Sequence, residues 1–165
     1  MTRIHERMYA RCPFGKAPSY LEFYLDELSR NGGTDGAVLR LQVPLAELGL
    51  GIPGGAQLSR DVIAHFAPVN DDGFESQQIA VDWASDGGGP FPKFAGFIVI
   101  ESDEDYGTCS LVLDGAYDPP LGPVGAAFDA VLGRRIATVT ARHLLRALRQ
   151  KLEDEFVASQ QTRTT

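Results

Sequence analysis

Apolar and polar residues alternate along five stretches of the chain, a period of two that is typical of strands burying one face, and a sixth strand-length stretch is apolar throughout. Stretches that succeed one another through short turns predict an antiparallel meander. Pro44 lies near the end of the second stretch and indicates an edge strand or a strand end, because proline donates no hydrogen bond to a sheet. The predicted strands comprise residues 3–12, 37–45, 58–67, 76–84, 93–101 and 108–117.

The fifth predicted strand, KFAGFIVIE at residues 93–101, is apolar on both of its faces. This pattern is typical of a central strand that is covered on both sides. We therefore expect this strand in the interior of the sheet, with both faces buried. An exposed face on this strand would instead favour a homodimer.

Two stretches repeat their apolar residues at helical spacing. The first predicted helix comprises residues 17–30 and is followed by Asn31-Gly32-Gly33, which ends it. The second helical region is the longest in the chain and lies in its C-terminal third. A polar tail, residues 159–165, follows it and is predicted to be disordered.

The C-terminal helical region carries two apolar stripes that do not align. On a straight helix, the stripe before Gly133 lies roughly a third of a turn from the stripe after it. Glycine weakens a helix interior, so we predict a bend or break near Gly133. The segment Ala137–Phe156 would then pack on the sheet, and the segment Val124–Leu132 would cover a cavity.

Length and charge narrow the class of protein. A chain of 165 residues predicts one domain, here residues 1–158. A net charge of −7 gives no general attraction to phosphate backbones or anionic membranes, so we expect no nucleic-acid partner. The charged N-terminus resembles no signal peptide, and no apolar run reaches the ~20 residues of a membrane span. We therefore expect a soluble, cytoplasmic protein without membrane insertion.

Two loops resemble known motifs only in part. GLGIPG at residues 49–54 fits G-x-G-x-x-G, but a strand pattern follows where a dinucleotide site needs a helix. A flexible loop, acting as a lid at a cavity mouth, is the better interpretation. The acidic segment 101–107 has Tyr106 where a calcium loop of the EF-hand type needs glycine. A solvated hairpin turn is expected there, and no cofactor is predicted.

The histidines and cysteines form no recognisable ligand cluster. His5, His65 and His143 are far apart in the sequence, and none has a metal-ligand partner at short spacing. No metal site is therefore predicted. Cys12 and Cys109 belong to no paired-cysteine motif, and we expect buried, reduced thiols.

The segment LDGAYDPPLGPVGAAFDAVLGRRIATVTARHLLRALRQKLE, residues 113–153, resembles the C-terminal signature of bacterial polyketide cyclase-like proteins. These belong to the START-related superfamily, with coenzyme Q-binding proteins and the pathogenesis-related plant allergens. The resemblance implies an α+β helix-grip fold, in which a curved antiparallel sheet grips a long C-terminal helix. It also implies a cavity that often holds an apolar small molecule. No catalytic motif is shared across the superfamily, so the resemblance assigns no catalytic residue.

Glu6 is the candidate for a catalytic residue, because it shares a strand face with Ile4, Met8 and Ala10. A carboxyl group in an apolar cavity has a raised pKa and would suit proton transfer of the cyclase type. An ion pair with an arginine, or an exposed position near the strand end, are the alternative interpretations.

The candidate ligand-binding residues are large apolar side chains on the buried stripes. Core packing alone would explain them, but the same side chains would line a cavity between the sheet and the C-terminal helix. They are Phe66, Trp83, Tyr117, Phe128, Val131 and Leu132.

Three functions remain open at this point. The first is binding of a hydrophobic or amphipathic small molecule, such as a lipid. The second is a cyclase or dehydratase acting on a polyketide-like substrate. The third is a protein-interaction module with a filled core, which a pocket below ~300 Å³ would favour.

Overall fold

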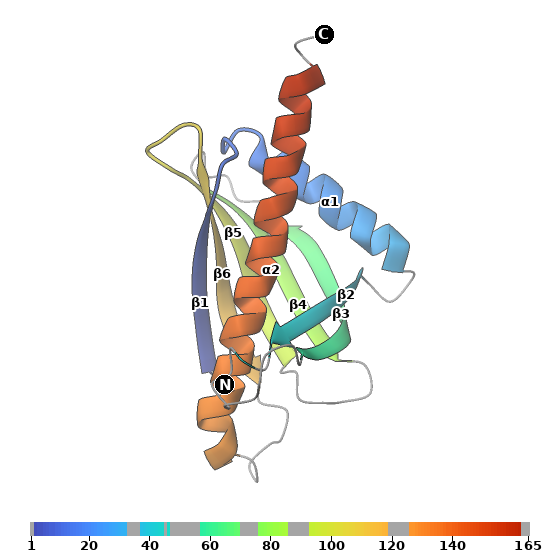
Figure 1. The fold of residues 1–165 in the computed structure, drawn as a ribbon, viewed down its shortest axis with the longest axis vertical. Helices are drawn as coiled ribbons and strands as arrows, with labels where there is room; N and C mark the ends of the chain where they lie inside the picture. Colours follow the sequence, from blue (N-terminus) through green and yellow to red (C-terminus); the bar gives the residue numbers. More distant parts are fainter. Residues whose placement is uncertain are drawn as a thin grey trace.

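The computed structural model describes residues 2–32, 37–44, 46, 57–69, 76–85, 93–118 and 126–162. Within them, the first strand and the first helix are followed by five further strands and a long C-terminal helix (Figure 1). The predicted ends of the strands and of the first helix agree with the observed ends to within two residues. The elements are β1 (Thr2–Ala10), α1 (Ala17–Gly32), β2 (Ala37–Pro44), β3 (Gln57–Val69), β4 (Ser76–Ser85), β5 (Lys93–Ser102), β6 (Cys109–Asp118) and α2 (Ala126–Thr162).

The strands form one antiparallel sheet in the order β1-β6-β5-β4-β3-β2. The predicted meander is confirmed, because each strand from β2 to β5 pairs with the next one along the chain. Strand β1 forms the other edge of the sheet and pairs with β6. Pro44 is the final residue of the edge strand β2, as its missing N–H group requires.

Helix α2 is gripped by both edges of the sheet. It contacts β1 and β2, which lie at opposite ends of the strand order, so the sheet curls around the helix (Figure 1). Two side-chain contacts align α2 with the β1 end of the sheet. Arg142 binds Glu6, and Glu153 accepts a hydrogen bond from the backbone N–H of Arg11. The α+β helix-grip class predicted from the sequence is confirmed.

The core lies between the inner face of the sheet and the two helices. The late apolar stripe of α2 is buried against this face, as predicted, and Phe156 packs half-buried at its end. Burying one leucine side chain stabilises a fold by about 1.5–3 kcal/mol, so this stripe is a large part of the stability. The buried members of the stripe are Ala137, Ala141, Leu144, Leu145, Leu148 and Leu152.

The predicted break near Gly133 is wrong. Figure 1 shows α2 as one unbroken helix. It spans 37 residues, and Gly133 is a buried residue within it. A glycine in a helix interior costs about 1 kcal/mol relative to alanine. A break would leave several backbone N–H and C=O groups without partners, which costs more. The helix also continues through residues 159–162, which the sequence assigned to a polar tail. Neither described helix has a stretch apolar enough to cross a membrane.

The prediction that β5 is covered on both faces is also wrong, although the strand is central in the sheet. Its outer face is open, and Phe97 on that face is 43% exposed. The neighbouring strand β6 is the one buried on both faces, from Cys109 to Leu113. Its outer face is covered because Arg7 of β1 and Glu101 of β5 form an ion pair of 2.7 Å across it.

A pair of glycines allows an aromatic ring to lie flat on the inner face of the sheet. Gly96 and Gly115 are opposite each other on β5 and β6. The Phe94 ring lies so close to both that a Cβ atom on Gly115 would be 2.5 Å from its Cζ atom. The same ring stacks on Trp83, with ring centroids 4.2 Å apart. Glycine is therefore required at both positions by the close approach of ring and backbone.

We predict that Gly115→Ala destabilises the protein by about 1–3 kcal/mol, as overpacking typically does. The added methyl group would also lie 2.5 Å from the carbonyl oxygen of Ala95, so the backbone itself must shift. Urea unfolding followed by circular dichroism measures the change. Gly15→Ala is the matched control, because a Cβ atom there has no heavy atom within 4 Å, and its effect should stay within about 0.5 kcal/mol. Equal effects of the two substitutions would contradict this account.

Candidate ligand-binding site

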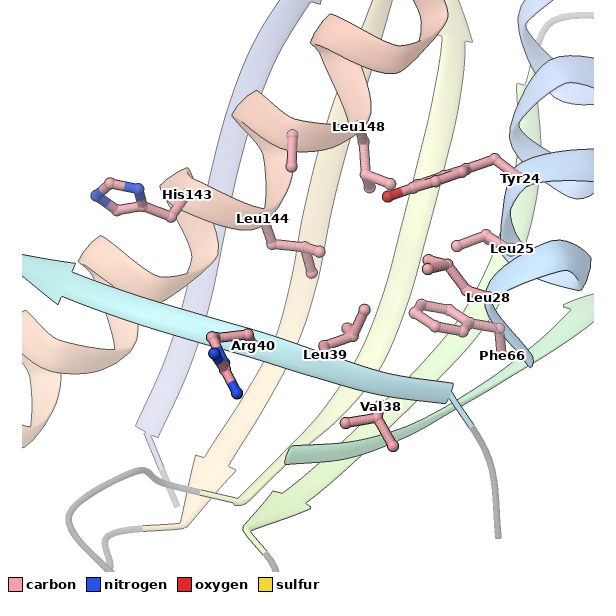
Figure 2. Close-up of a pocket in the computed structure, with 11 residues that line it drawn as sticks. Tyr24, Leu25, Leu28, Val38, Leu39, Arg40, Phe66, His143, Leu144 and Leu148 are labelled. Atoms are coloured by element: carbon pink, nitrogen blue, oxygen red, sulfur yellow. The ribbon is translucent and has the colours of Figure 1, made fainter. Parts of the chain in front are cut away.

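A pocket of about 360 Å³ lies where α1, β2, β3 and α2 meet (Figure 2). This volume is above the ~300 Å³ below which a filled core would be favoured. Most of the side chains around the pocket are apolar. The lining residues are Tyr24, Leu25, Leu28, Val38, Leu39, Arg40, Phe66, His143, Leu144, Ala147 and Leu148.

The pocket follows from the spacing of residues on the two helices. Leu25 and Leu28 point from one face of α1, and Leu144 and Leu148 are one turn apart on α2. Side chains of this size would meet and fill the junction if every position carried one. Ala147 reaches less far than its leucine neighbours, which leaves space between the two helices and the edge of the sheet.

Two of the polar lining groups already have partners. The Arg40 guanidinium donates two hydrogen bonds to Asp61, of 2.8 and 3.1 Å, and these lower the pKa of the Asp61 carboxyl and raise that of Arg40. His143 also makes an interaction of its own. Figure 2 shows the Arg40 guanidinium and the His143 ring pointing away from the leucine cluster. The apolar parts of these side chains therefore face the pocket.

The predicted ligand-binding residues do not all gather at this pocket. Phe66 lines it. Trp83 and Tyr117 are buried in the core cluster at other positions, and neither is among the lining residues. Phe128, Val131 and Leu132 belong to α2, but their side chains lie outside the described residues. A role for these five residues in ligand binding stays a prediction.

The core around Trp83 has two features that the sequence prediction missed. Phe94 completes a row of aromatic side chains on neighbouring strands, because it is opposite Trp83 on β4 and Tyr117 on β6. The Trp83 Nε1 atom is buried and has no hydrogen-bond partner among the described residues. Phe94 lies in a predicted strand that is apolar on both of its faces, so the sequence marked it as apolar without showing that its face is the inner one.

Glu6 is held in an ion pair. Its carboxylate accepts a hydrogen bond of 2.9 Å from the Arg142 guanidinium, and its side chain is 19% exposed. This is the arginine pairing that was one of the alternative interpretations. Glu6 is not among the residues that line the pocket, and a catalytic role for it stays a prediction.

The other motifs supply no reactive or metal-binding group in the described part of the chain. His5 and His65 lie on the outer face and pair with Asp114 and Asp82. Residues 103–108 form the exposed hairpin expected between β5 and β6. No group of three potential metal ligands occurs among the described residues. The proposed lid, residues 49–54, lies outside them.

Both cysteines are free and buried, as predicted. Burial raises the pKa of the Cys12 thiol to about 11, and the nearby charge of Glu153 adds to this effect. Burial likewise raises the pKa of Cys109 to about 12, with smaller contributions from Cys12, Asp103 and Glu153. A thiol of this kind is protonated near neutral pH and is a poor nucleophile.

We predict that neither thiol of the folded protein reacts with iodoacetamide near pH 8. Modification should be at least about 100-fold faster in concentrated urea, where both thiols are exposed with a pKa of about 8.5. Mass spectrometry measures the labelling. Since the folded pKa values are raised, the protonated thiols stabilise the fold fully below about pH 8.5, and this contribution is lost as pH rises towards 11. Rapid labelling of the native protein would contradict the burial of these thiols.

No protein-family model matches the sequence, and no curated protein matches it. Solved structures do resemble the chain. A conserved protein from Geobacillus kaustophilus is 17% identical, with a TM-score of 0.53 over 96% of this chain and 97% of its own. A protein from Thermus thermophilus is 13% identical, with a TM-score of 0.51 over 92% of this chain and 97% of its own.

The Zhui aromatase/cyclase from Streptomyces sp. R1128 is also similar, at 15% identity and a TM-score of 0.42 over 92% of this chain and 93% of its own. At that TM-score, the likeness carries no argument about the chemistry of this chain. The two more similar structures match nearly the whole of both chains, and they support the fold alone.

Proposed function

Starting from the START-related helix-grip fold of this chain, we propose that it binds a hydrophobic small molecule in the pocket between α1, β2 and α2. The observation that carries the proposal is the pocket itself. It is lined mostly by apolar side chains, it has about 360 Å³ of space, and it is formed by elements from both ends of the chain. Burial of apolar ligand surface at roughly 25 cal/mol per Å² would supply the binding free energy.

Binding is favoured over catalysis by the state of the polar groups. A general acid or base must reach the reacting atom with a proton to give or to accept. The charge of Arg40 is already neutralised by Asp61, and the His143 ring points away from the leucine cluster (Figure 2). The candidate acid Glu6 is paired with Arg142 and does not line the pocket, so the hydroxyl of Tyr24 is left among the polar lining groups. A cyclase or dehydratase activity therefore has weaker support than ligand binding, and no cofactor enters the proposal.

The size of the pocket suggests a small ligand. A volume of about 360 Å³ lies near the lower end of the range for ligand pockets. A one- or two-ring molecule or a short acyl chain suits this volume. A long-chain lipid would extend beyond it.

We predict that Ala147→Trp abolishes this binding. Ala147 lies at the exposed side of the pocket, so an indole there fills the space without entering the core. The probe is the two-ring dye 6-propionyl-2-(dimethylamino)naphthalene, a neutral molecule whose fluorescence shifts to shorter wavelength in apolar surroundings. Its affinity should fall at least about tenfold, a loss of about 1.4 kcal/mol or more.

Ala158→Trp is the matched control, because Ala158 is an exposed alanine of the same helix and is not among the lining residues. It should bind the probe as the wild type does. Thermal unfolding of both variants checks that the fold is retained. If the wild type bound no probe, or if Ala147→Trp bound it unchanged, the pocket would not be the binding site.

A further inference from the structure

Among the described residues that line the pocket, one side chain has a polar atom that is available to a ligand. Among the polar lining residues, Arg40 is bound to Asp61 and His143 has an interaction of its own. The hydroxyl group of Tyr24 has no hydrogen-bond partner among the described residues. Figure 2 shows this hydroxyl directed from α1 towards Leu148 on α2, between the apolar walls.

The position of the Tyr24 ring is restrained before any ligand arrives. The ring is half-buried and packs against the core cluster. The ammonium group of Lys151 lies 5.5 Å from the ring centroid, a cation–π contact that links α1 to α2. Lys151 is itself held by Glu155 at 2.9 Å. The hydroxyl is therefore presented to the pocket at a defined place, which reduces the entropy lost on binding.

A filled pocket changes the surroundings of this hydroxyl. Water can reach it while the pocket is empty, because the side chain is only half-buried. An apolar ligand would displace that water and leave the hydroxyl without a partner, which is unfavourable. A ligand with an oxygen atom at this point would restore the hydrogen bond. A site built in this way discriminates against analogues that lack the oxygen.

We propose that Tyr24 determines the specificity of the pocket, for small apolar molecules that carry one neutral hydrogen-bonding oxygen, such as a ketone or an alcohol. The inference rests on the proposed function and extends it to the class of ligand. A neutral oxygen is favoured over a carboxylate because the Arg40 charge is neutralised by Asp61 and the protein carries a net charge of −7.

The test compares two probes of matched shape, 2-acetylnaphthalene and 2-isopropenylnaphthalene, in which a CH2 group replaces the carbonyl oxygen. Affinities are measured by NMR titration for the wild type and for Tyr24→Phe, which removes the hydroxyl and keeps the ring. Tyr20→Phe is the matched control, since Tyr20 is a half-buried tyrosine one turn earlier on α1 and does not line the pocket.

Tyr24→Phe should weaken binding of the ketone about 2- to 10-fold, the range of one hydrogen bond. Binding of the hydrocarbon should change less than twofold, and Tyr20→Phe should change neither. The infrared carbonyl stretch of the bound ketone gives a second readout. It should lie at lower frequency in the wild type than in Tyr24→Phe, because a hydrogen bond weakens the C=O bond.

The failures of the two proposals are distinguishable. If neither probe binds the wild type, the proposed function fails and this inference fails with it. If both probes bind, but Tyr24→Phe changes neither the ketone affinity nor its carbonyl stretch, the role of Tyr24 is wrong and the binding function stands. If 2-naphthoate binds the wild type more tightly than 2-acetylnaphthalene, the neutral class of ligand is wrong.

Discussion

The sheet must curl far enough for both of its edge strands to contact one helix, and the rest of the structure depends on this constraint. Strands β1 and β2 lie at opposite ends of the sheet order, yet α2 touches both. The glycine pair Gly96–Gly115 lies on the neighbouring strands β5 and β6, where a ring can approach the backbone closely. Phe94 covers these glycines and stacks on Trp83, so these two aromatic rings fill the space on the inner face beside the glycine pair. The buried stripe of α2 then packs inside the curve.

The candidate pocket forms where the two helices pack against the β2 edge of this curled sheet. Helix α1 lies beside β2 and β3, so the junction of α1, β2 and α2 is formed by three surfaces that pack through their side chains. Packing of separate surfaces leaves space where one side chain is small, as at Ala147. The charged and imidazole groups around that space are paired or turned outwards, which leaves an apolar interior with the hydroxyl of Tyr24.

The outer face of the sheet carries ion pairs between neighbouring strands, whereas the inner face carries the apolar core. Histidine–aspartate pairs and the Arg7–Glu101 pair cross between strands, and a hydrogen bond with His5 lowers the pKa of the Asp114 carboxyl. These are exposed pairs of the kind that contributes little to stability. Phe97 is an exposed aromatic residue on this face, and a homodimer through it stays a prediction.

The sequence by itself determined the elements, because hydrophobic period is a local property of the chain. Alternation located five of the strands, a continuous apolar run located β5, and helical spacing placed Leu144, Leu145 and Leu148 on a buried stripe. The same local reasoning failed at Gly133. The two apolar stripes point in different directions and suggested a break there, but α2 is continuous, because an unbroken helix keeps its backbone hydrogen bonds. It also predicted that β5 is buried on both faces. The strand buried in this way is β6, because side chains of its neighbours β1 and β5 meet across its outer face. Only the tertiary structure could show where the pocket lies. Packing brings Tyr24, Leu39 and Ala147 together from three elements, and the periodicity of the sequence does not show which faces of those elements meet.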